Sequence, residues 1–342
     1  MSTTAIVILN WNGVDFLDQF LPSLIAHSTG YDIIVADNAS SDDSVSFLEN
    51  NFPSLKIIQN ASNGGFAKGY NDALQTIQGQ YDYYLLLNSD IEVTKNWLPP
   101  LTSVLDKHAE IAGVQPKIKS FHQRNLFEHA GAAGGMIDKN NYPFCRGRIF
   151  DYVEEDHGQY DFSREVFWTS GACMLIRASV FHELGGFDES FFAHMEEIDL
   201  CWRAKNRGYS FRFEPASKVY HVGGGTLPYE SPRKTFLNFR NSLYMIHKNH
   251  EGWLPGKIFY RLLLDGIAGL KYAVGFKFKH VAAILKAHFA YYGQLGSLTK
   301  KRGSLNQLRN SPTSGGRFKG SILFNYFVKG IKTFDQLDKK RF

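Results

Sequence analysis

The polar triplet Asn88, Ser89 and Asp90 follows an unbroken apolar run, YYLLL, at residues 83–87. Such a run is typical of a strand buried on both faces of a parallel sheet. Ligands of open α/β sheets bind at the carboxyl ends of the strands, so the triplet is expected to reach a ligand crevice. Asn88 and Asp90 would point the same way and could share a hydrated divalent cation with phosphates. An Asx turn that leaves a buried strand is the simpler explanation of these three residues alone.

Three acidic residues stand at the start of an expected amphipathic helix, which follows the aromatic stretch SFFAHM and ends at Gly208. Glu196 and Asp199 share one face, and Asp199 forms a favourable i, i+4 pair with Arg203. Glu197 points about 100° round the helix axis. Acids in a first turn ordinarily complement the helix dipole on a solvated face. The preceding aromatic residues indicate instead the partly buried mouth of a site.

His221 ends a further predicted strand, residues 217–221, in the segment VYHVGGGT. A lone histidine is more often a surface or core residue than a ligand. Its place at a strand end, just before a run of glycines, makes it a candidate for a side chain that reaches a site.

Strands and helices alternate along the first third of the chain. Buried strands are predicted at residues 4–9, 31–38, 55–59, 83–87 and 111–116, and helices at 14–27 and 42–52. A third helix is opened by the Gly-rich segment ASNGGFAKGYNDAL and runs to about residue 77. Alternation at this interval predicts an α/β protein with a doubly wound, mostly parallel sheet and right-handed crossovers.

Two loops of this sheet carry candidate nucleotide ligands. Asp37 and Asn38 follow the second strand, where an acid is well placed to bond a nucleoside base or ribose. Gly64, Gly65 and Gly69 lack the spacing of the dinucleotide fingerprint and of the P-loop, which excludes a nicotinamide enzyme and a P-loop nucleotidase. They permit a close backbone approach at a helix N-terminus, suitable for anchoring a nucleotide. A tight turn that packs the helix on the sheet explains them equally well.

The composition describes a globular chain with two unlike parts. Its 342 residues suffice for one large or two ordinary domains. We expect no signal peptide before TTAIVILNWN, and reduced thiols in a cytoplasmic protein for Cys145, Cys173 and Cys201. Residues 1–232 contain 17 Lys and Arg against 29 Asp and Glu, whereas residues 233–342 contain 21 against 4. This asymmetry indicates that the second part meets a polyanion or an anionic surface.

The remaining segments are expected to be a β-rich insertion and a helical region. The insertion is expected at residues 117–165, with a mobile surface loop at DYVEEDHGQYD. Residues 317–341 are expected to form a loosely held tail. Helices are predicted at 237–247, 257–272 and 278–292, with aromatic and leucine faces and basic residues elsewhere. Arg261, Asp265 and Lys271 interrupt the most apolar helix, which argues against a membrane span.

Two uses of the basic helices are open. Interfacial helices bound to an anionic membrane surface fit the charge and the aromatic residues. Packing between the subunits of a homodimer is the alternative, because apolar faces need partners. Nucleic acid is not an expected partner, since no reader motif accompanies the charge.

Eight segments resemble, in the same order, blocks of the inverting, nucleotide-sugar-dependent family 2 glycosyltransferases with the GT-A fold, especially their bacterial rhamnosyltransferase-like branch. They are VILNWNG, VADNASSDDS, NGGFAKGYN, LLLNSD, WTSGACMLIR, GGFDESFFAHMEEIDLCWR, VYHVGGGT and FRNSLYMIHK. The resemblance covers about residues 3–245, and its specificity lies in the order of the blocks. It implies a GT-A catalytic domain, residues 1–232, followed by a basic amphipathic helical region and tail, residues 233–342.

The resemblance also implies roles for individual residues. On the donor side it places Asp37 at the base of the nucleotide sugar. Further residues along the nucleotide sugar are Asn10, Asn38, Asn63, Gly65 and Asn71. NSD, that is Asn88, Ser89 and Asp90, occupies the place of the DxD motif, with Asp90 and His221 as ligands of Mn²⁺ or Mg²⁺. Asn88 replaces an Asp and removes one charge from that site. On the acceptor side it places Trp168, Gly171 and Asp199.

The pair Glu196 and Glu197 stands where many members of the family have Glu-Asp. Glu197 matches the catalytic base, and the longer side chain leaves open which of the two reaches the acceptor. A divalent cation would stabilise the departing nucleoside diphosphate, and a carboxylate opposite would deprotonate the acceptor hydroxyl. One carboxylate suffices for a single inverting displacement, and no nucleophile for a retaining path is identified.

The predicted function is therefore transfer of a sugar from dTDP-rhamnose or a UDP-sugar to a cell-surface glycan precursor. The expected acceptor is lipid-linked, and the expected location is peripheral, on the inner face of the cell membrane. A sugar-nucleotide pyrophosphorylase is one alternative, although VILNWNG lacks the basic Gly-rich loop of that class. A non-catalytic nucleotide-binding or membrane-surface-binding module of the same fold is another.

Overall fold

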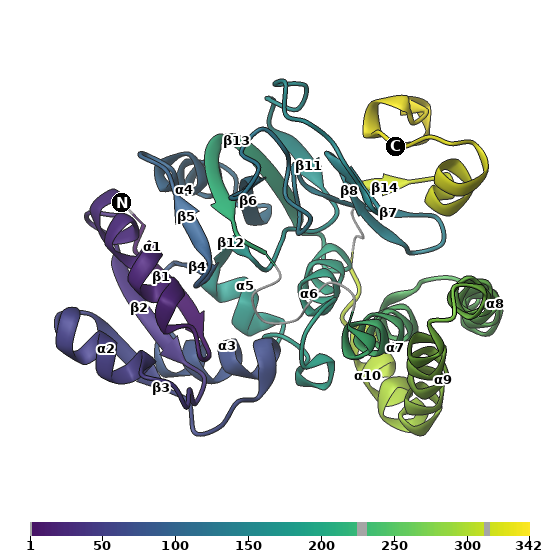
Figure 1. Cartoon of the computed structure of the whole chain (residues 1–342), viewed down its shortest axis with the longest axis horizontal. Helices are drawn as coiled ribbons and strands as arrows, with labels where there is room; N and C mark the ends of the chain where they lie inside the picture. Colours follow the sequence, from purple (N-terminus) through teal and green to yellow (C-terminus); the bar gives the residue numbers. More distant parts are fainter. Residues whose placement is uncertain (1, 224–230, 311–314) are drawn as a thin grey trace.

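A nine-stranded sheet lies at the centre of the molecule (Figure 1). The computed structural model describes residues 2–223, 231–310 and 315–342. The strands of this sheet are β1 (Thr4–Asn10), β2 (Asp32–Asp37), β3 (Lys56–Gln59), β4 (Tyr83–Asn88), β5 (Ile91–Val93), β6 (Ile111–Ser120), β11 (Arg164–Val166), β12 (Cys173–Arg177) and β13 (Ser210–His221). In the described residues they follow the order β11-β13-β6-β12-β4-β1-β2-β3, with β5 paired to β13.

The pairing gives most strands of the sheet one direction. β3, β2, β1 and β4 pair in parallel, and so do β13 and β6. β12 runs antiparallel between β4 and β6, and β5 and β11 run antiparallel to β13. Among the described strands six therefore point one way and three the other, and the predicted mostly parallel α/β sheet is confirmed.

Helices cover both faces of the sheet because successive side chains of the central strands face opposite sides. Val7 and Ala5 of β1 belong to the core under α3 (Gly65–Thr76), α5 (Ala178–Glu183) and α6 (Glu196–Lys205). Ile6 and Ile8 belong to the opposite core, under α1 (Val14–His27), α2 (Ser44–Asn51) and α4 (Leu98–Lys107). The doubly wound arrangement follows directly from this alternation.

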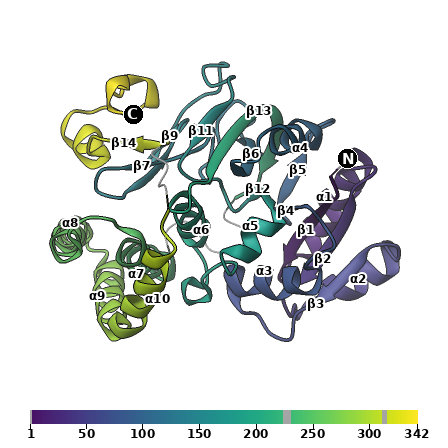
Figure 2. The same cartoon turned by 180° about the vertical axis from the view of Figure 1, so that it is seen from behind.

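The predicted β-rich insertion forms a second sheet. Its strands are β7 (Gly135–Asp138), β8 (Pro143–Cys145), β9 (Arg148–Ile149) and β10 (Tyr152–Val153), joined at one edge by β14 (Arg317–Phe318) from the C-terminal segment. The segment after β14 lies beside this sheet (Figure 2), with the side chains of Phe318, Ile322 and Phe334 buried. The prediction of a loosely held tail is therefore wrong, because widely spaced apolar residues anchor the segment.

The acidic segment at residues 151–161 is packed against the domain. The Asp156 carboxylate lies 3.0 Å from the ammonium groups of both Lys117 and Lys119, and the Tyr160 side chain is buried. The expected mobile surface loop is therefore wrong. Its acids pair with lysines of β6 that the sequence does not place beside them.

Four helices form the basic C-terminal region: α7 (Pro232–Asn249), α8 (Leu254–Val274), α9 (Phe278–Gly293) and α10 (Leu295–Gln307). The first three were predicted, whereas α10 has too few apolar residues to show a helical period. Lys248 Nζ of α7 lies 2.8 Å from Asp199 Oδ2 and 2.6 Å from Asp188 Oδ2, so contacts cross residue 232. That domain boundary stays a prediction. Within the described ranges, none of the helices has the length and apolar character that crossing a membrane requires.

Candidate active site

A large cleft opens at the carboxyl ends of β1, β4 and β13. Asp90, Glu196, Glu197 and His221 all line it, although they lie far apart in the sequence. Its volume of about 2140 Å³ exceeds the roughly 300–1,000 Å³ of ordinary ligand pockets. The cleft is therefore large enough for two substrates at once.

Strand pairing places Asp90 beside His221. Ile91 of β5 is opposite His221 of β13, and the Val222 N–H donates to the Asp90 carbonyl at 3.1 Å. Asp90 Oδ1 lies 3.1 Å from His221 Nε2, and Glu128 Oε2 lies 3.1 Å from His221 Nδ1. The imidazole ring is thus held between two carboxylates.

The opposite charges of His221 and its two carboxylate neighbours stabilise one another. Burial lowers the pKa of His221, but the Asp90 and Glu128 carboxylates outweigh burial and raise that pKa to about 10. Burial likewise raises the pKa of Glu128, yet His221 outweighs it and lowers that pKa to about 2. With no other cation, the group is a buried carboxylate–imidazolium–carboxylate chain.

Asp90 and His221 are suitable ligands for a divalent cation. A histidine that binds a metal through one ring nitrogen usually donates its other N–H to a carboxylate, which is the position of Glu128. Within the part of the chain that the structure describes, no group of three or more His, Cys, Asp or Glu side chains could hold a metal ion. A cation on Asp90 and His221 would therefore need further ligands, such as diphosphate oxygens.

Glu196 and Glu197 begin α6 after a turn with unusual backbone angles. Phe192, His194 and Met195 have φ of 64°, 70° and 73°. Such angles cost of order 1–3 kcal/mol each at residues other than glycine and are found mostly at functional sites. The turn brings both carboxyl groups to the cleft wall, with Glu196 buried and Glu197 half-buried.

The two carboxyl groups differ in how they hold a proton. Burial raises the pKa of Glu197 to about 7. Burial, with the neighbouring Glu197 charge, holds the pKa of Glu196 well above its usual range. Glu197 can therefore exchange a proton near neutral pH, and the raised pKa of Glu196 favours its neutral form.

Asn241 of α7 holds the turn before α6. Its fully buried amide nitrogen lies 2.7–3.0 Å from three carbonyl oxygens, those of Phe191, Ala193 and His194. On the other side, the Phe66 N–H at the start of α3 donates to the Phe192 carbonyl at 2.8 Å. Two helices thus fix the strained backbone that presents Glu197.

A polar network lies at the carboxyl ends of β1 and β2, next to the start of α3. Asp37 Oδ2 accepts the Ser40 N–H at 2.9 Å, and Asn10 Nδ2 donates to Asp37 Oδ1 at 3.3 Å. Asn38 Nδ2 donates to Asn63 Oδ1 at 3.0 Å and to the Gly65 carbonyl at 3.1 Å. The Asn10 Oδ1 atom is buried and has no hydrogen-bond partner among the described residues, and Asn10 and Asp37 do not belong to the described cleft lining.

Gly65 allows α3 to approach the turn before α6. Its φ is +78°, and a Cβ at this position would lie 2.4 Å from the Phe192 carbonyl oxygen. The tight packing turn, one of the two explanations of this glycine cluster, is thus present. Gly65 also lines the cleft.

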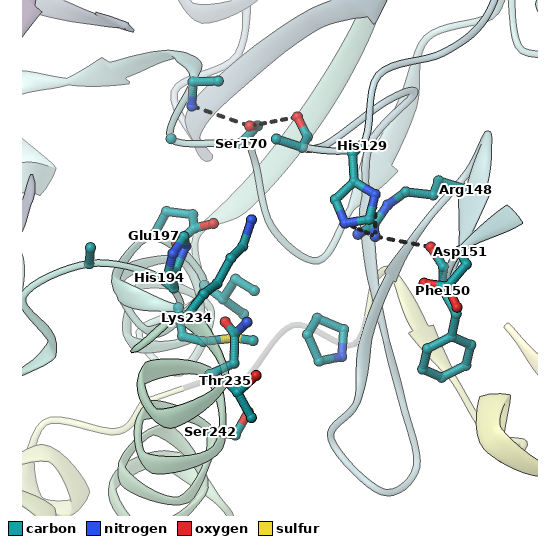
Figure 3. A pocket seen from close by; sticks show the side chains of 18 of the residues that line it. His129, Arg148, Phe150, Asp151, Ser170, His194, Glu197, Lys234, Thr235 and Ser242 are labelled. Atoms are coloured by element: carbon teal, nitrogen blue, oxygen red, sulfur yellow. Dashed lines mark hydrogen bonds between the residues drawn. The ribbon is translucent and has the colours of Figure 1, made fainter. Parts of the chain in front are cut away.

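Figure 3 shows the wall around Glu197. Glu197, His194 and Lys234 lie on one side, and His129 and Arg148 on the other. Ser170 Oγ donates to the Ala130 carbonyl at 2.9 Å, which fixes the loop between the two sides.

Two further residues of this loop face the cleft. Gly171 lies beside Glu197, since a Cβ on Gly171 would be 3.7 Å from the Glu197 Cβ. Trp168 also lines the cleft, with its indole N–H donated to the Met136 carbonyl at 2.9 Å.

The chain matches two models of known families. The model of glycosyl transferase family 2 matches residues 5–185, more than half of the chain. This chain belongs to glycosyl transferase family 2. The model of glycosyl transferase family group 2 matches residues 108–291 of this glycosyltransferase.

Relatives of this family 2 glycosyltransferase include two rhamnosyltransferases. The N-acetylglucosaminyl-diphospho-decaprenol L-rhamnosyltransferase of Mycobacterium tuberculosis is 21% identical over 262 residues, which are 72% of this chain and 85% of that protein. Rhamnosyltransferase WbbL of Escherichia coli K12 is 25% identical over 229 residues, 63% of this chain and 82% of its own length. The enzyme thus falls in the rhamnosyltransferase-like branch, as the resemblance implies. It is a glycosyltransferase and not the sugar-nucleotide pyrophosphorylase that was the enzymatic alternative.

Solved structures show the same fold at low sequence identity. GalNAc-T7, determined with UDP, GalNAc and Mn²⁺, gives a TM-score of 0.57 at 18% identity over 72% of this chain. This chain spans about half of that one, 48%. Mannosyltransferase PcManGT of Pyrobaculum calidifontis, with GDP-Man and Mn²⁺, gives 0.52 at 11% identity over 90% of this chain and 81% of its own. The fold of the glycosyltransferase is therefore GT-A, as predicted.

Four predicted site residues do not belong to the described cleft lining: Asn10, Asp37, Asn71 and Asp199. The side chains of the last two join other elements of the fold. Asn71, predicted to lie along the diphosphate, donates to the Phe187 carbonyl and accepts the Phe187 N–H, both at 2.9 Å. Asp199, predicted on the acceptor side, is fully buried and lies 2.8 Å from both Arg203 Nε and Lys248 Nζ. Both assignments are wrong, because hydrogen bonds and ion pairs to other elements of the glycosyltransferase occupy these side chains. The other assigned residues stay predictions.

Sequence reasoning missed four residues around the cleft: Glu128, Arg148, Lys234 and Asn241. Glu128 and Arg148 belong to the insertion, which lacks a regular period. Lys234 and Asn241 belong to α7, where FRNSLYMIHK resembled a family block without indicating any role. The neighbouring glycines of VYHVGGGT at 224 and 225 lie outside the described residues.

We expect Asn241→Ala to lower both stability and transfer. The change removes the Asn241 donor from the Ala193 and His194 carbonyl groups, whereas the Phe191 carbonyl keeps Arg240 as a donor. Lost buried hydrogen bonds of this kind cost about 1–3 kcal/mol of unfolding free energy. It also releases the turn that positions Glu197, and transfer should fall by about tenfold, since small displacements of catalytic groups are costly. Urea unfolding and the transfer rate are the measurements. Asn51→Ala on α2, whose exposed amide bonds only within its own helix, is the control. An unchanged rate in a destabilised Asn241→Ala protein contradicts the positioning role.

Glu196→Gln is expected to stabilise the protein at high pH alone. In the unfolded chain Glu196 ionises above its ordinary pKa of 4.5, whereas the pKa of the folded side chain is raised, so the wild type loses stability as pH rises above 4.5. Glutamine removes this loss. The Tm of the variant should exceed that of the wild type at about pH 8 and match it at about pH 4. Equal differences at both pH values contradict a raised pKa.

Proposed function

We propose that the enzyme transfers a sugar from a nucleoside-diphosphate donor, dTDP-rhamnose or a UDP-sugar, to a hydroxyl group of a lipid-linked glycan precursor, with inversion. The observation that carries the proposal is that Glu197 and the Asp90–His221 pair line one cleft. The names of the two rhamnosyltransferase relatives support the donor, and that of the mycobacterial enzyme supports a lipid-linked acceptor.

The donor binds at the sheet edge in this proposal. The base meets Asp37, and the ribose and diphosphate lie along Asn10, Asn38, Asn63, Gly65, Asn88 and Ser89. Asp90 and His221 hold Mn²⁺ or Mg²⁺, and Glu128 orients the imidazole ring. When bound, the cation acts as a Lewis acid that stabilises the charge of the departing diphosphate. The Mn²⁺ in the two similar structures supports a divalent cation here.

The acceptor binds on the side of Trp168 and Gly171. Glu197 accepts the proton of the acceptor hydroxyl while that oxygen attacks the anomeric carbon from the face opposite the diphosphate. The neighbouring carboxyl group, Glu196, stays neutral and leaves Glu197 as the single base. One displacement inverts the anomeric configuration.

The basic helical region brings the enzyme to the inner face of the cell membrane in this proposal. Residues 233–342 carry 21 Lys and Arg against 4 Asp and Glu, which favours an anionic lipid surface. We keep peripheral binding from the cytoplasmic side as the proposed location, and packing of these helices between two subunits as its alternative.

The rate of transfer should depend on pH through Glu197. Because the base acts only when deprotonated, kcat/KM should rise with pH, bend at an apparent pKa of about 7 and then stay constant. At about pH 6 it should be about tenfold below the plateau. Initial rates in buffers of constant ionic strength measure this profile. A profile that is flat from about pH 5.5 to 8 argues against Glu197 as the base.

Thermal unfolding with candidate donors tests the proposed substrate class. At about 100 times its dissociation constant a true donor stabilises the native state by about 2.7 kcal/mol. We expect dTDP-rhamnose or a UDP-sugar to raise Tm more in the presence of Mn²⁺ than in its absence, and NMR of the product to show the inverted anomer. Absence of any shift with nucleoside-diphosphate sugars contradicts the proposal.

A further inference from the structure

The cleft does not end at Glu197 but continues along α8. Side chains on one face of this helix line it, among them Leu264, Ile267 and Ala268. The opposite wall comes from the π-helical turn η2 (Phe324–Val328) of the C-terminal segment, whose Phe324, Phe327 and Val328 also line the cleft. Two segments about sixty residues apart in sequence thus form one apolar passage, continuous with the catalytic site.

The walls of this passage are apolar yet exposed. Ile267 is 65%, Phe327 55% and Val328 68% exposed. Ring contacts hold Phe327, whose ring centroid is 5.2 Å from that of Phe150 and 5.3 Å from Lys271 Nζ. A preformed apolar surface that is left open to solvent is typical of a binding site for an apolar group.

Basic side chains lie between Glu197 and the apolar passage. Lys234 and Arg148 face the cleft from opposite walls (Figure 3), and Lys271 and Lys277 line it further along. Three acids lie nearby: Asp265 is buried and paired with Arg261 at 2.7 Å, Glu128 lies 3.1 Å from His221 Nδ1, and Asp151 is exposed. The four basic side chains outnumber them. The middle of the cleft therefore suits an anionic group.

We propose that the apolar passage between α8 and η2 binds the hydrocarbon chain of a polyprenyl-diphosphate-linked acceptor. The order of groups in the cleft matches that molecule: the base Glu197 at the sugar, Lys234 and Arg148 at the diphosphate, and Ile267 with Phe327 at the chain. The inference rests on the proposed function and adds a defined site for the lipid part of the acceptor. Phe259, Leu263 and Leu270 of the same helix are 52–65% exposed.

The test compares the binding of undecaprenyl diphosphate and geranyl diphosphate, which share a head group and differ in chain length. Equilibrium dialysis in detergent measures both affinities for the full-length wild type, for Ile267→Ser with Phe327→Ser, and for Leu285→Ser with Phe289→Ser. The control pair on α9 is 54% and 74% exposed and does not belong to the described cleft lining. All four side chains are at least half exposed, so both double variants should keep the wild-type Tm.

We expect the wild type to prefer the long chain by about tenfold or more, because several buried methylene groups add to its affinity. The cleft variant should lose most of this preference, and the control variant should keep it. Any of three results overturns the inference: no preference in the wild type, a preference retained by the cleft variant, or an equal loss of the preference in the control variant. The third result would indicate that the exposed apolar side chains bind a bilayer or micelle and not a single lipid chain. Donor-induced thermal shifts are independent of this outcome: their absence refutes the proposed function, and their presence with a failed lipid test refutes the chain site alone.

Discussion

Replacing Glu197 by glutamine is expected to lower the rate of glycosyl transfer by about 10²–10⁴-fold, the usual contribution of a general base. Glutamine keeps the size and the hydrogen-bonding shape of the side chain but cannot accept the acceptor proton. Donor binding should be unchanged, because none of the proposed donor contacts is made by the Glu197 side chain. The thermal shift with donor and the rate of product formation together measure the two effects.

Glu196→Gln is the matched control for this prediction. Glu196 adjoins Glu197 and lines the same cleft, and burial raises its pKa, which favours the neutral form. An amide in place of a neutral carboxylic acid should change the transfer rate by less than about threefold, as expected for a group that does not transfer a proton. If Glu196→Gln abolishes transfer and Glu197→Gln does not, the roles of the two residues are exchanged. If both variants remain fully active, neither is the base.

Asp90→Ala is expected to cause the second large loss, about 10²–10³-fold in transfer rate, since electrostatic stabilisation of a leaving group contributes several kcal/mol. The change removes one of the two proposed cation ligands and leaves His221 with the Glu128 carboxylate as its remaining partner. Mn²⁺ binding in the presence of nucleoside diphosphate, followed by electron paramagnetic resonance, should weaken in parallel. This readout does not depend on transfer.

Asp151→Ala provides the matched control for Asp90→Ala. Asp151 is an exposed acid that lines the same cleft in the insertion, on the far side of His129 and Arg148. Its removal should leave both Mn²⁺ affinity and transfer within about twofold of the wild type, as for an exposed charge without a fixed partner. Wild-type Mn²⁺ affinity in Asp90→Ala contradicts the assignment of the ligand.

The alternating half of the fold was open to prediction because its signals are local. A strand buried on both faces reads as a continuous apolar run, as in β4, and α1 has the predicted bounds, Val14–His27. The edge of a parallel sheet then places Asn88 and Asp90 at the cleft without further information. Local periodicity and a topology rule thus suffice for this part of the site.

The rest of the site depends on contacts between distant segments. Asp199 and Asn71 have the residue types of ligands, and their structural roles follow only from the proximity of Lys248 and Phe187. Glu128 gains its role from the partner on β13, His221, which no sequence period relates to it. The C-terminal segment joins β7 as a fifth strand of the small sheet and forms a wall of the cleft, although its sequence is not that of a long strand or helix.

Release of nucleoside diphosphate from dTDP-rhamnose and from UDP-sugars, with Mn²⁺ and a lipid-linked N-acetylglucosamine acceptor, tests the central claim most directly. The wild type should release nucleoside diphosphate in proportion to glycosylated product, whereas Glu197→Gln should bind the same donor and release almost none. Donor binding by the wild type without release, or equal release by wild type and Glu197→Gln, would show that this cleft does not carry out base-assisted glycosyl transfer.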